Sequence, residues 1–147
     1  MKKILPPTLF LICAIVMLLL HVLLPLYSII GFPTNAIGIV PLVFGLGIAA
    51  WGSSVFARVG TSIKTFEQPQ KLVTDGLFRY SRNPMYLGFV FALLGIAIAL
   101  GTLSPLLGVM IFFLVADRGY IPYEENMLAQ KFGQGFQTYQ SKTRRWL

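Results

Sequence analysis

The sequence has few of the residues that build the active sites of many soluble enzymes. Its 147 residues include one cysteine, Cys13, and one histidine, His21. A lone cysteine cannot form an internal disulfide, and the Cys and His spacings typical of a zinc site do not occur. No Walker-type or dinucleotide-type glycine-rich loop occurs either. Triad hydrolysis, metal catalysis and P-loop phosphoryl transfer are therefore disfavoured.

Charged residues are also scarce, at 12% of the chain against 56% apolar residues. An average soluble domain has about 25% charged residues. Residues 4–32, 37–57 and 83–116 contain no Asp, Glu, Lys or Arg at all. These long uncharged runs predict an integral membrane protein, surrounded by membrane lipids. The length fits a single domain, residues 1–147.

Turn-forming residues divide the uncharged runs into helices. The motif GFPTN separates the first two runs, and GTLSP interrupts the third. As one helix the third run would be roughly 51 Å long, which exceeds the ~30 Å hydrocarbon core, so a tight hairpin is expected. The predicted fold is all-α, with about four transmembrane helices at 7–29 (bent near Pro25), 37–57, 84–100 and 105–116.

Two polar segments lie outside these helices. Residues 58–82 form a loop that is long for a compact membrane domain, and long ordered loops are often functional. In the tail, Pro122 followed by Glu124 and Glu125 predicts the start of an interfacial helix. Its apolar stripe is Met127, Leu128, Phe132 and Phe136, and Arg144, Arg145 and Trp146 are expected to act as interfacial anchors.

All twelve Lys and Arg residues are predicted on one side of this bundle. They precede the first helix, occupy the 58–82 loop or follow residue 117, and the other two connections carry none. By the positive-inside rule that side is cytoplasmic, which places both termini and both polar segments at the inner face of a bacterial cytoplasmic membrane. Topology and anionic lipid account for the net charge of +7. Nucleic acid is not an expected partner.

The two polar segments carry a family resemblance. LVTDGLFRYSRNPMYLG at residues 72–88, followed by EENML, FG, a Tyr and RRW, resembles the isoprenylcysteine carboxyl methyltransferase family and its bacterial relatives. That broader superfamily includes phospholipid methyltransferases. The resemblance covers residues 72–147 and implies S-adenosylmethionine as methyl donor. It also implies a membrane-embedded or lipophilic acceptor: an isoprenylcysteine carboxylate, a phospholipid amine or a small thiol.

The resemblance also implies particular site residues. A carboxylate such as Glu124 suits the cationic groups of the donor, and the helix start at Pro84 suits its carboxylate. Arg82 is expected to orient an anionic acceptor or brace Glu124, and Glu125 to act as the base for an amine acceptor. The implied cofactor contacts are Gln70, Lys71, Leu72, Val73, Phe78, Asn83, Pro84, Met85, Tyr86 and Glu124.

Two residues depart from the family pattern. Asn83 stands where the eukaryotic enzymes have His, and Tyr120 where the prenylcysteine enzymes have an arginine for the substrate.

One alternative function is an NADPH-dependent membrane reductase of the related sterol-reductase group. The other is a non-enzymatic scaffold or transporter subunit, although the near absence of polar groups inside the helices disfavours transport. The sequence does not indicate an oligomeric state.

Overall fold

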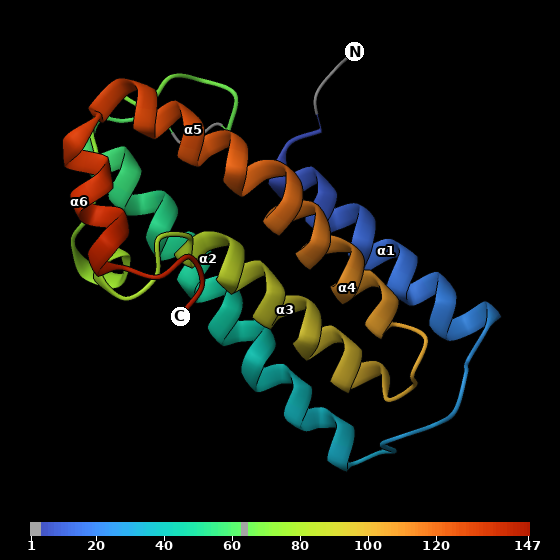
Figure 1. Ribbon diagram of the computed structural model, residues 1–147. Helices are drawn as coiled ribbons and strands as arrows, with labels where there is room; N and C mark the ends of the chain where they lie inside the picture. Colours follow the sequence, from blue (N-terminus) through green and yellow to red (C-terminus); the bar gives the residue numbers. More distant parts are fainter. Residues whose placement is uncertain (1–3, 63–64) are drawn as a thin grey trace.

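The computed structural model describes residues 4–62 and 65–147, and within them the chain is helical with no β-strand (Figure 1). Lys2, Lys3 and Lys64, which entered the charge count above, lie outside the described residues. The elements in chain order are α1 (Pro6–Leu23), the 3₁₀ turn η1 (Thr34–Gly38), α2 (Ile39–Val59), the 3₁₀ turn η2 (Gly76–Arg79), α3 (Pro84–Leu100), α4 (Leu106–Val115), the π-helical turn η3 (Ala116–Tyr120), α5 (Ile121–Phe132) and α6 (Gln134–Lys142).

α3 is the central helix of the bundle, in contact with α1, α2 and α4. Its closest neighbour is α2, because glycines let the two backbones touch. A Cβ placed on Gly45 would lie 2.3 Å from the carbonyl oxygen of Gly88, and one on Gly38 would lie 2.4 Å from that of Gly95. Small residues are the usual means of close helix packing in membranes. Of the α2 glycines Gly45, Gly47 and Gly52, only Gly47 has open space around it.

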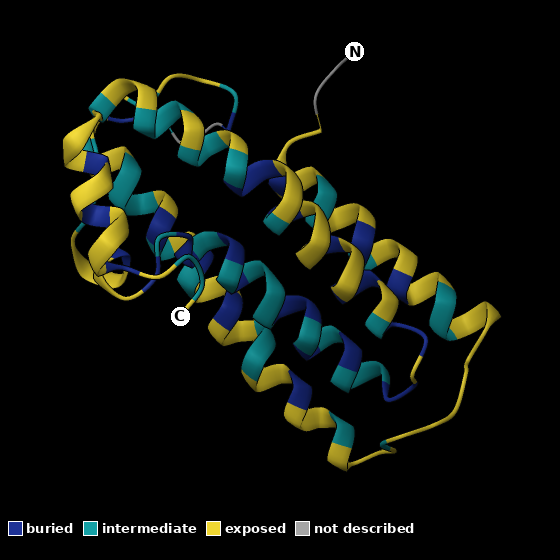
Figure 2. Cartoon of the chain, viewed as in Figure 1, coloured by how far each residue is buried: buried dark blue, intermediate teal, exposed yellow. Residues whose placement is uncertain are grey.

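Large apolar side chains face outward from the bundle, in particular on α1, α2 and α4 (Figure 2). The interior holds Met17, Leu93 and Phe112, all fully buried. Among the described residues, three helices are long and apolar enough to cross a membrane: Pro6–Leu23, Thr34–Val59 and Leu106–Phe132. With 17 residues, α3 is shorter. The all-α prediction is confirmed for the described residues, whereas a fourth crossing stays a prediction.

One end of the bundle, here called the turn end, carries the α1–α2 connection and the α3–α4 turn. α1 ends at Leu23, so the prediction of a helix to residue 29 with a bend is wrong. The residue before a proline avoids helical conformation, and Leu24, before Pro25, has φ −142° and ψ 65°. The chain then runs along the α3–α4 turn, where the Gly101 carbonyl accepts hydrogen bonds from the N–H groups of Ile29 and Ile30 at 2.8 and 3.2 Å.

The opposite end, here called the loop end, carries residues 60–62 and 65–83 of the 60–83 loop, together with α5 and α6. α3 has the predicted bounds, starting at Pro84 and ending before Gly101. α5 begins at Ile121 with Pro122 in its first turn, as predicted, and α4, η3 and α5 follow one another without a break. The π-helical turn changes the hydrogen-bond ladder just before Pro122 and so allows the helix to continue past a residue without an N–H. The chain reverses at Gly133, whose φ is 50°, and α6 folds back over the loop.

Candidate functional site

A cavity lies at the loop end, between the 60–83 loop, the start of α3, α5 and α6. Almost all the predicted site residues meet there. Gln70 is the exception: it does not line the cavity, and its backbone N–H instead donates to Thr61 Oγ1 at 2.8 Å. The predicted residues on the cavity wall are Lys71, Leu72, Val73, Phe78, Arg82, Asn83, Pro84, Met85, Tyr86, Glu124 and Glu125.

The wall also contains residues that sequence reasoning missed or assigned elsewhere. Met127, Leu128 and Phe136 were predicted to form the apolar stripe of one interfacial helix, but they line the cavity, Met127 and Leu128 from α5 and Phe136 from α6, which folds back after Gly133. The helical spacing of these apolar residues could be seen in the sequence. The surface that they face could not. Other wall residues carried no signal in the sequence: Phe56, Ser62, Thr65, Glu67 and Pro69.

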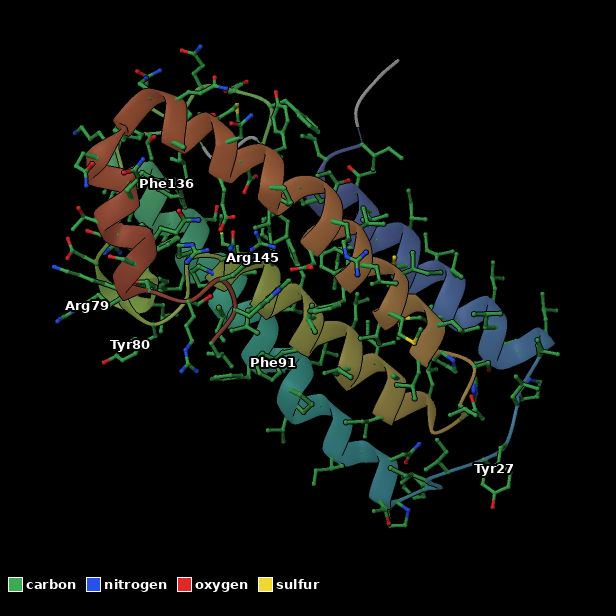
Figure 3. All side chains as sticks on the ribbon, viewed as in Figure 1. Tyr27, Arg79, Tyr80, Phe91, Phe136 and Arg145 are labelled. Atoms are coloured by element: carbon green, nitrogen blue, oxygen red, sulfur yellow. The ribbon has the colours of Figure 1, made fainter. Side chains whose placement is uncertain are left out.

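The C-terminal segment holds the loop just before α3. The N–H of Arg82 donates to the carbonyl of Arg144 at 2.9 Å, and Asn83 Nδ2 donates to that of Arg145 at 3.0 Å. The Arg82 guanidinium also donates to the carbonyl of Thr143. Figure 3 shows Arg145 beside the start of α3, with Phe136 on α6 at the same end of the bundle and Tyr27 at the turn end.

Two further hydrogen bonds hold the C-terminal part of the chain against the loop end. Trp146 Nε1 donates to Asp117 Oδ1 at 2.9 Å. The Tyr139 hydroxyl donates to the carbonyl of Phe78 at 2.6 Å. Burial raises the pKa of Tyr139 to about 12, so this hydroxyl keeps its proton at neutral pH. The predicted interfacial anchors Arg145 and Trp146 therefore make specific contacts that position the site.

Both carboxylate oxygens of Glu125 accept hydrogen bonds from arginine side chains. Its Oε1 accepts from Arg82 Nη2 at 2.7 Å and Nε at 3.0 Å, and its Oε2 accepts from Arg145 Nη2 at 2.8 Å. The side chains of Arg82 and Glu125 are only 10% and 11% exposed. The hydrogen bond to Glu125 raises the pKa of Arg145 above its ordinary value. Charge-assisted pairs of this kind are among the strongest hydrogen bonds, so Glu125 is fixed in place.

Glu124, the adjacent residue, has a different environment. Its Oε1 accepts a hydrogen bond from the Tyr86 hydroxyl at 2.9 Å, and Tyr86 Oη lies 3.3 Å from Thr65 Oγ1. Within the described residues Glu124 has no ion pair, and Arg82, expected as a possible brace for it, binds Glu125 instead. The cavity wall thus carries a carboxylate that no described cation neutralises.

This arrangement fits a cationic ligand with an acidic group of its own. Glu124 offers the counter-charge for a sulfonium or ammonium group, and the first-turn N–H groups of α3 face the loop and suit a carboxylate. Phe78, Tyr86 and Tyr139 supply aromatic surface on the same wall. The described residues hold no group of three or more His, Cys, Asp or Glu suited to a metal ion.

Comparisons with known proteins agree in pointing to methyl transfer. A sequence model of the phospholipid methyltransferase family matches residues 33–135. An uncharacterized protein of Haemophilus influenzae is 43% identical over 63 residues, covering 43% of this chain and 100% of that protein. No solved structure shows a significant match.

Two plant relatives carry more specific names. A probable protein-S-isoprenylcysteine O-methyltransferase of Oryza sativa subsp. indica is 38% identical over 80 residues, covering 52% of this chain and 40% of that protein. The protein-S-isoprenylcysteine O-methyltransferase B of Arabidopsis thaliana is 36% identical over 75 residues, covering 50% of this chain and 37% of that protein. The matches therefore span about two fifths of the length of these plant proteins.

Proposed function

The chain belongs to the phospholipid methyltransferase family, with relatives named protein-S-isoprenylcysteine O-methyltransferases, and on that premise we propose that it transfers a methyl group from S-adenosylmethionine to a lipophilic acceptor. The observation that supports the proposal most is the carboxylate of Glu124, which lies on the cavity wall without an ion-pair partner among the described residues. Family membership favours methyl transfer over the reductase and scaffold alternatives.

The reaction takes place at the inner face of the cytoplasmic membrane, with the loop end on the cytoplasmic side. Every Lys and Arg that the structure describes lies in the last turn of α2, in the loop before α3, on η3, α5 or α6, or in the C-terminal segment, and the connections of the turn end carry none. α3 completes a four-helix bundle across the membrane. Its 17 residues span about 26 Å, near the ~30 Å hydrocarbon core. Its position between α1, α2 and α4 shields it from lipid.

The residues on the cavity wall have different roles in this reaction. S-adenosylmethionine supplies an activated methyl group on a sulfonium. Glu124 stabilises the positive charge, and the N–H groups at the start of α3 hold the carboxylate of the ligand. Arg82, Glu125 and Arg145 act as positioning residues, because their ion pairs join the loop, α5 and the C-terminal segment into one rigid wall. Rigid positioning of two reactants can provide a large part of the rate enhancement.

Isothermal titration of the purified protein with S-adenosylmethionine tests this function. We expect the wild type to bind and Glu124→Gln to bind at least tenfold more weakly, since a hydrogen bond to a charged group contributes about 1.5–3 kcal/mol. Asp75→Asn is the matched control, because Asp75 is an exposed acid on the loop before α3 and does not line the cavity. Failure of the wild type to bind would contradict the function, and equal affinity of Glu124→Gln would contradict the role of Glu124.

A further inference from the structure

Thr65, on the 60–83 loop, is a buried polar side chain to which the proposed reaction gives no role. It is 5% exposed. Among the described residues of this loop, Thr65 alone lines both the cavity assigned to the donor and a second, mostly apolar cavity next to α1, α2 and α3. The other residues common to the two walls are Met85, Tyr86 and Glu124. The Thr65 hydroxyl therefore lies at the same boundary as the carboxylate assigned to the donor.

Two hydroxyl groups, here called the hydroxyl chain, connect Thr65 to Glu124. The Tyr86 hydroxyl donates to Glu124 Oε1 at 2.9 Å, and Thr65 Oγ1 lies 3.3 Å from Tyr86 Oη. A phenol has one proton to donate, and Tyr86 directs it to the carboxylate, so Tyr86 Oη accepts a hydrogen bond from Thr65. Both donors in the chain thus point toward Glu124. Hydrogen bonds that run in one direction polarise and strengthen one another inside a protein.

Aromatic contacts hold the two hydroxyl-bearing residues in place. The ring of Tyr86 stacks on that of Tyr120, with centroids 6.1 Å apart and planes inclined by 17°. Phe66, the residue after Thr65, packs edge-on against Tyr120 and Tyr123, with centroids 6.3 and 5.5 Å apart. Because Tyr120 lies on η3 and Tyr123 on α5, these contacts attach the loop to the same helical segment that carries the carboxylate.

The hydroxyl chain differs from the arginine network in what it does to a carboxylate. Arginines orient Glu125 and also neutralise it. A neutral hydroxyl orients a carboxylate and leaves its charge available to a ligand. Within the described residues Glu124 has no ion pair, so its charge is not compensated there. A carboxylate that must face the cationic group of a donor needs this combination of fixed direction and free charge.

We propose that Thr65 is a positioning residue for the methyl donor: through Tyr86, its hydroxyl fixes the Glu124 carboxylate in the orientation that binds the cationic group. This inference rests on the methyltransferase function proposed above. The competing interpretation is a structural role, since buried polar groups are generally hydrogen-bonded whatever their function. A structural role predicts that loss of the hydroxyl lowers stability alone. A positioning role predicts a loss of donor affinity that depends on Glu124.

Single variants test the role of the hydroxyl. By isothermal titration with S-adenosylmethionine, we expect Thr65→Val to bind about three- to tenfold more weakly than the wild type, as for one neutral hydrogen bond. Thr65→Ser keeps the hydroxyl and should bind within about twofold of the wild type. Thr102→Val is the control, because Thr102 is 8% exposed and its Oγ1 lies 2.8 Å from His21 Nδ1 at the turn end. It should lose thermal stability and keep its donor affinity.

Unchanged affinity in Thr65→Val would overturn the inference. An equal loss in Thr65→Ser would also overturn it, because the effect would then belong to the methyl group. An equal loss in Thr102→Val would do the same, because affinity would then follow stability in general.

Double variants test the route from the hydroxyl to the carboxylate. We expect Thr65→Val to weaken binding by less than about twofold when it is added to Tyr86→Phe or to Glu124→Gln, because the hydroxyl chain is then already broken or its charged end removed. The same fold-loss in either background as in the wild type would overturn the inference. Absence of donor binding by the wild type would instead contradict the proposed function, so the two failures are distinguishable.

Discussion

At the turn end of the bundle, the described contacts involve no Asp, Glu, Lys or Arg side chain. Asn35 Nδ2 donates to the carbonyl of Ala99 at 2.8 Å, and His21 Nδ1 and Thr102 Oγ1 lie 2.8 Å apart. At the loop end, arginines and carboxylates make most of the connections. In lipid, backbone and side-chain polar groups must find partners within the protein. The polar groups of the turn end do no more than pair with each other. The loop end has further polar groups that the packing of the bundle does not require.

The difference separates structural from functional polarity. Arg82, Glu125 and Arg145 neutralise each other, which is the arrangement expected of a stabilising network. Glu124 is excluded from that network although it is adjacent to Glu125 in the chain. A carboxylate that contributes little to closing the fold is the better candidate for acting on a ligand. Variants at the two ends should therefore have different consequences.

The largest effect is expected from Arg82→Ala at the loop end. Removing one partner of a buried ion pair leaves an unpaired charge and typically costs about 3–5 kcal/mol of unfolding free energy. Thermal unfolding in detergent measures the loss. The control is Arg118→Ala, because Arg118 is 82% exposed and lies 3.9 Å from Asp117. An exposed pair contributes about 0–1 kcal/mol, so similar losses in the two variants would contradict the structural role of the Arg82 network.

A smaller effect is expected at the turn end, from Gly101→Ala. Gly101 has φ 74°, and an added Cβ would lie 2.1 Å from the carbonyl oxygen of Ile30. The left-handed conformation costs an alanine about 1–2 kcal/mol, and the clash adds about 1–3 kcal/mol. Gly60→Ala is the control, since Gly60 has φ 70° and open space around it. This variant should show only the cost of the left-handed conformation, without a clash.

Donor affinity sharpens the comparison between the two ends. We expect Gly101→Ala to bind S-adenosylmethionine as the wild type does at temperatures where both are folded, and Arg82→Ala to bind more weakly. A parallel loss of binding in Gly101→Ala would mean that the two ends are coupled and that the division between structure and function does not hold.

The smallest effect concerns the pH dependence of stability. Tyr139 has an ordinary pKa of 10.0, raised by burial to about 12 in the folded protein. The unfolded chain releases this proton first, so the stabilisation is present below pH 10 and is lost between pH 10 and about 12. Unfolding of Tyr139→Phe should show a shallower decline across this window. Tyr80→Phe, at an exposed position, should decline as the wild type does.

The sequence predicted those features that depend on neighbouring residues in the chain. Pro84 and Gly101 bound α3 because one lacks an N–H and the other adopts a left-handed conformation. The clustering of the 72–88 segment with Glu124 and Glu125 followed from the family resemblance. These local and family signals were sufficient for the all-α fold of the described residues and for eleven of the twenty residues on the cavity wall.

The features that sequence reasoning missed depend on tertiary contacts. Successive residues on a helix point about 100° apart, so Glu124 and Glu125 had to face different surroundings. Which one faces the arginines depends on how α5 sits against residues 82 and 145. Pro122 signals a helix start in isolation, but the preceding π-helical turn allows the helix to continue. Gly133 reverses the chain and thereby turns Phe136 toward the cavity.

The glycines between α2 and α3 limit how this chain can change in length. Gly38, Gly45 and Gly52 recur every seven residues, and Gly88 and Gly95 repeat the interval on the partner helix. One residue inserted between Gly38 and Gly45 would rotate one of these contact points by about 100° relative to the other. Bulkier side chains would then replace a backbone contact. Insertions and deletions in relatives should therefore fall in the 60–83 loop and avoid the interior of this helix pair.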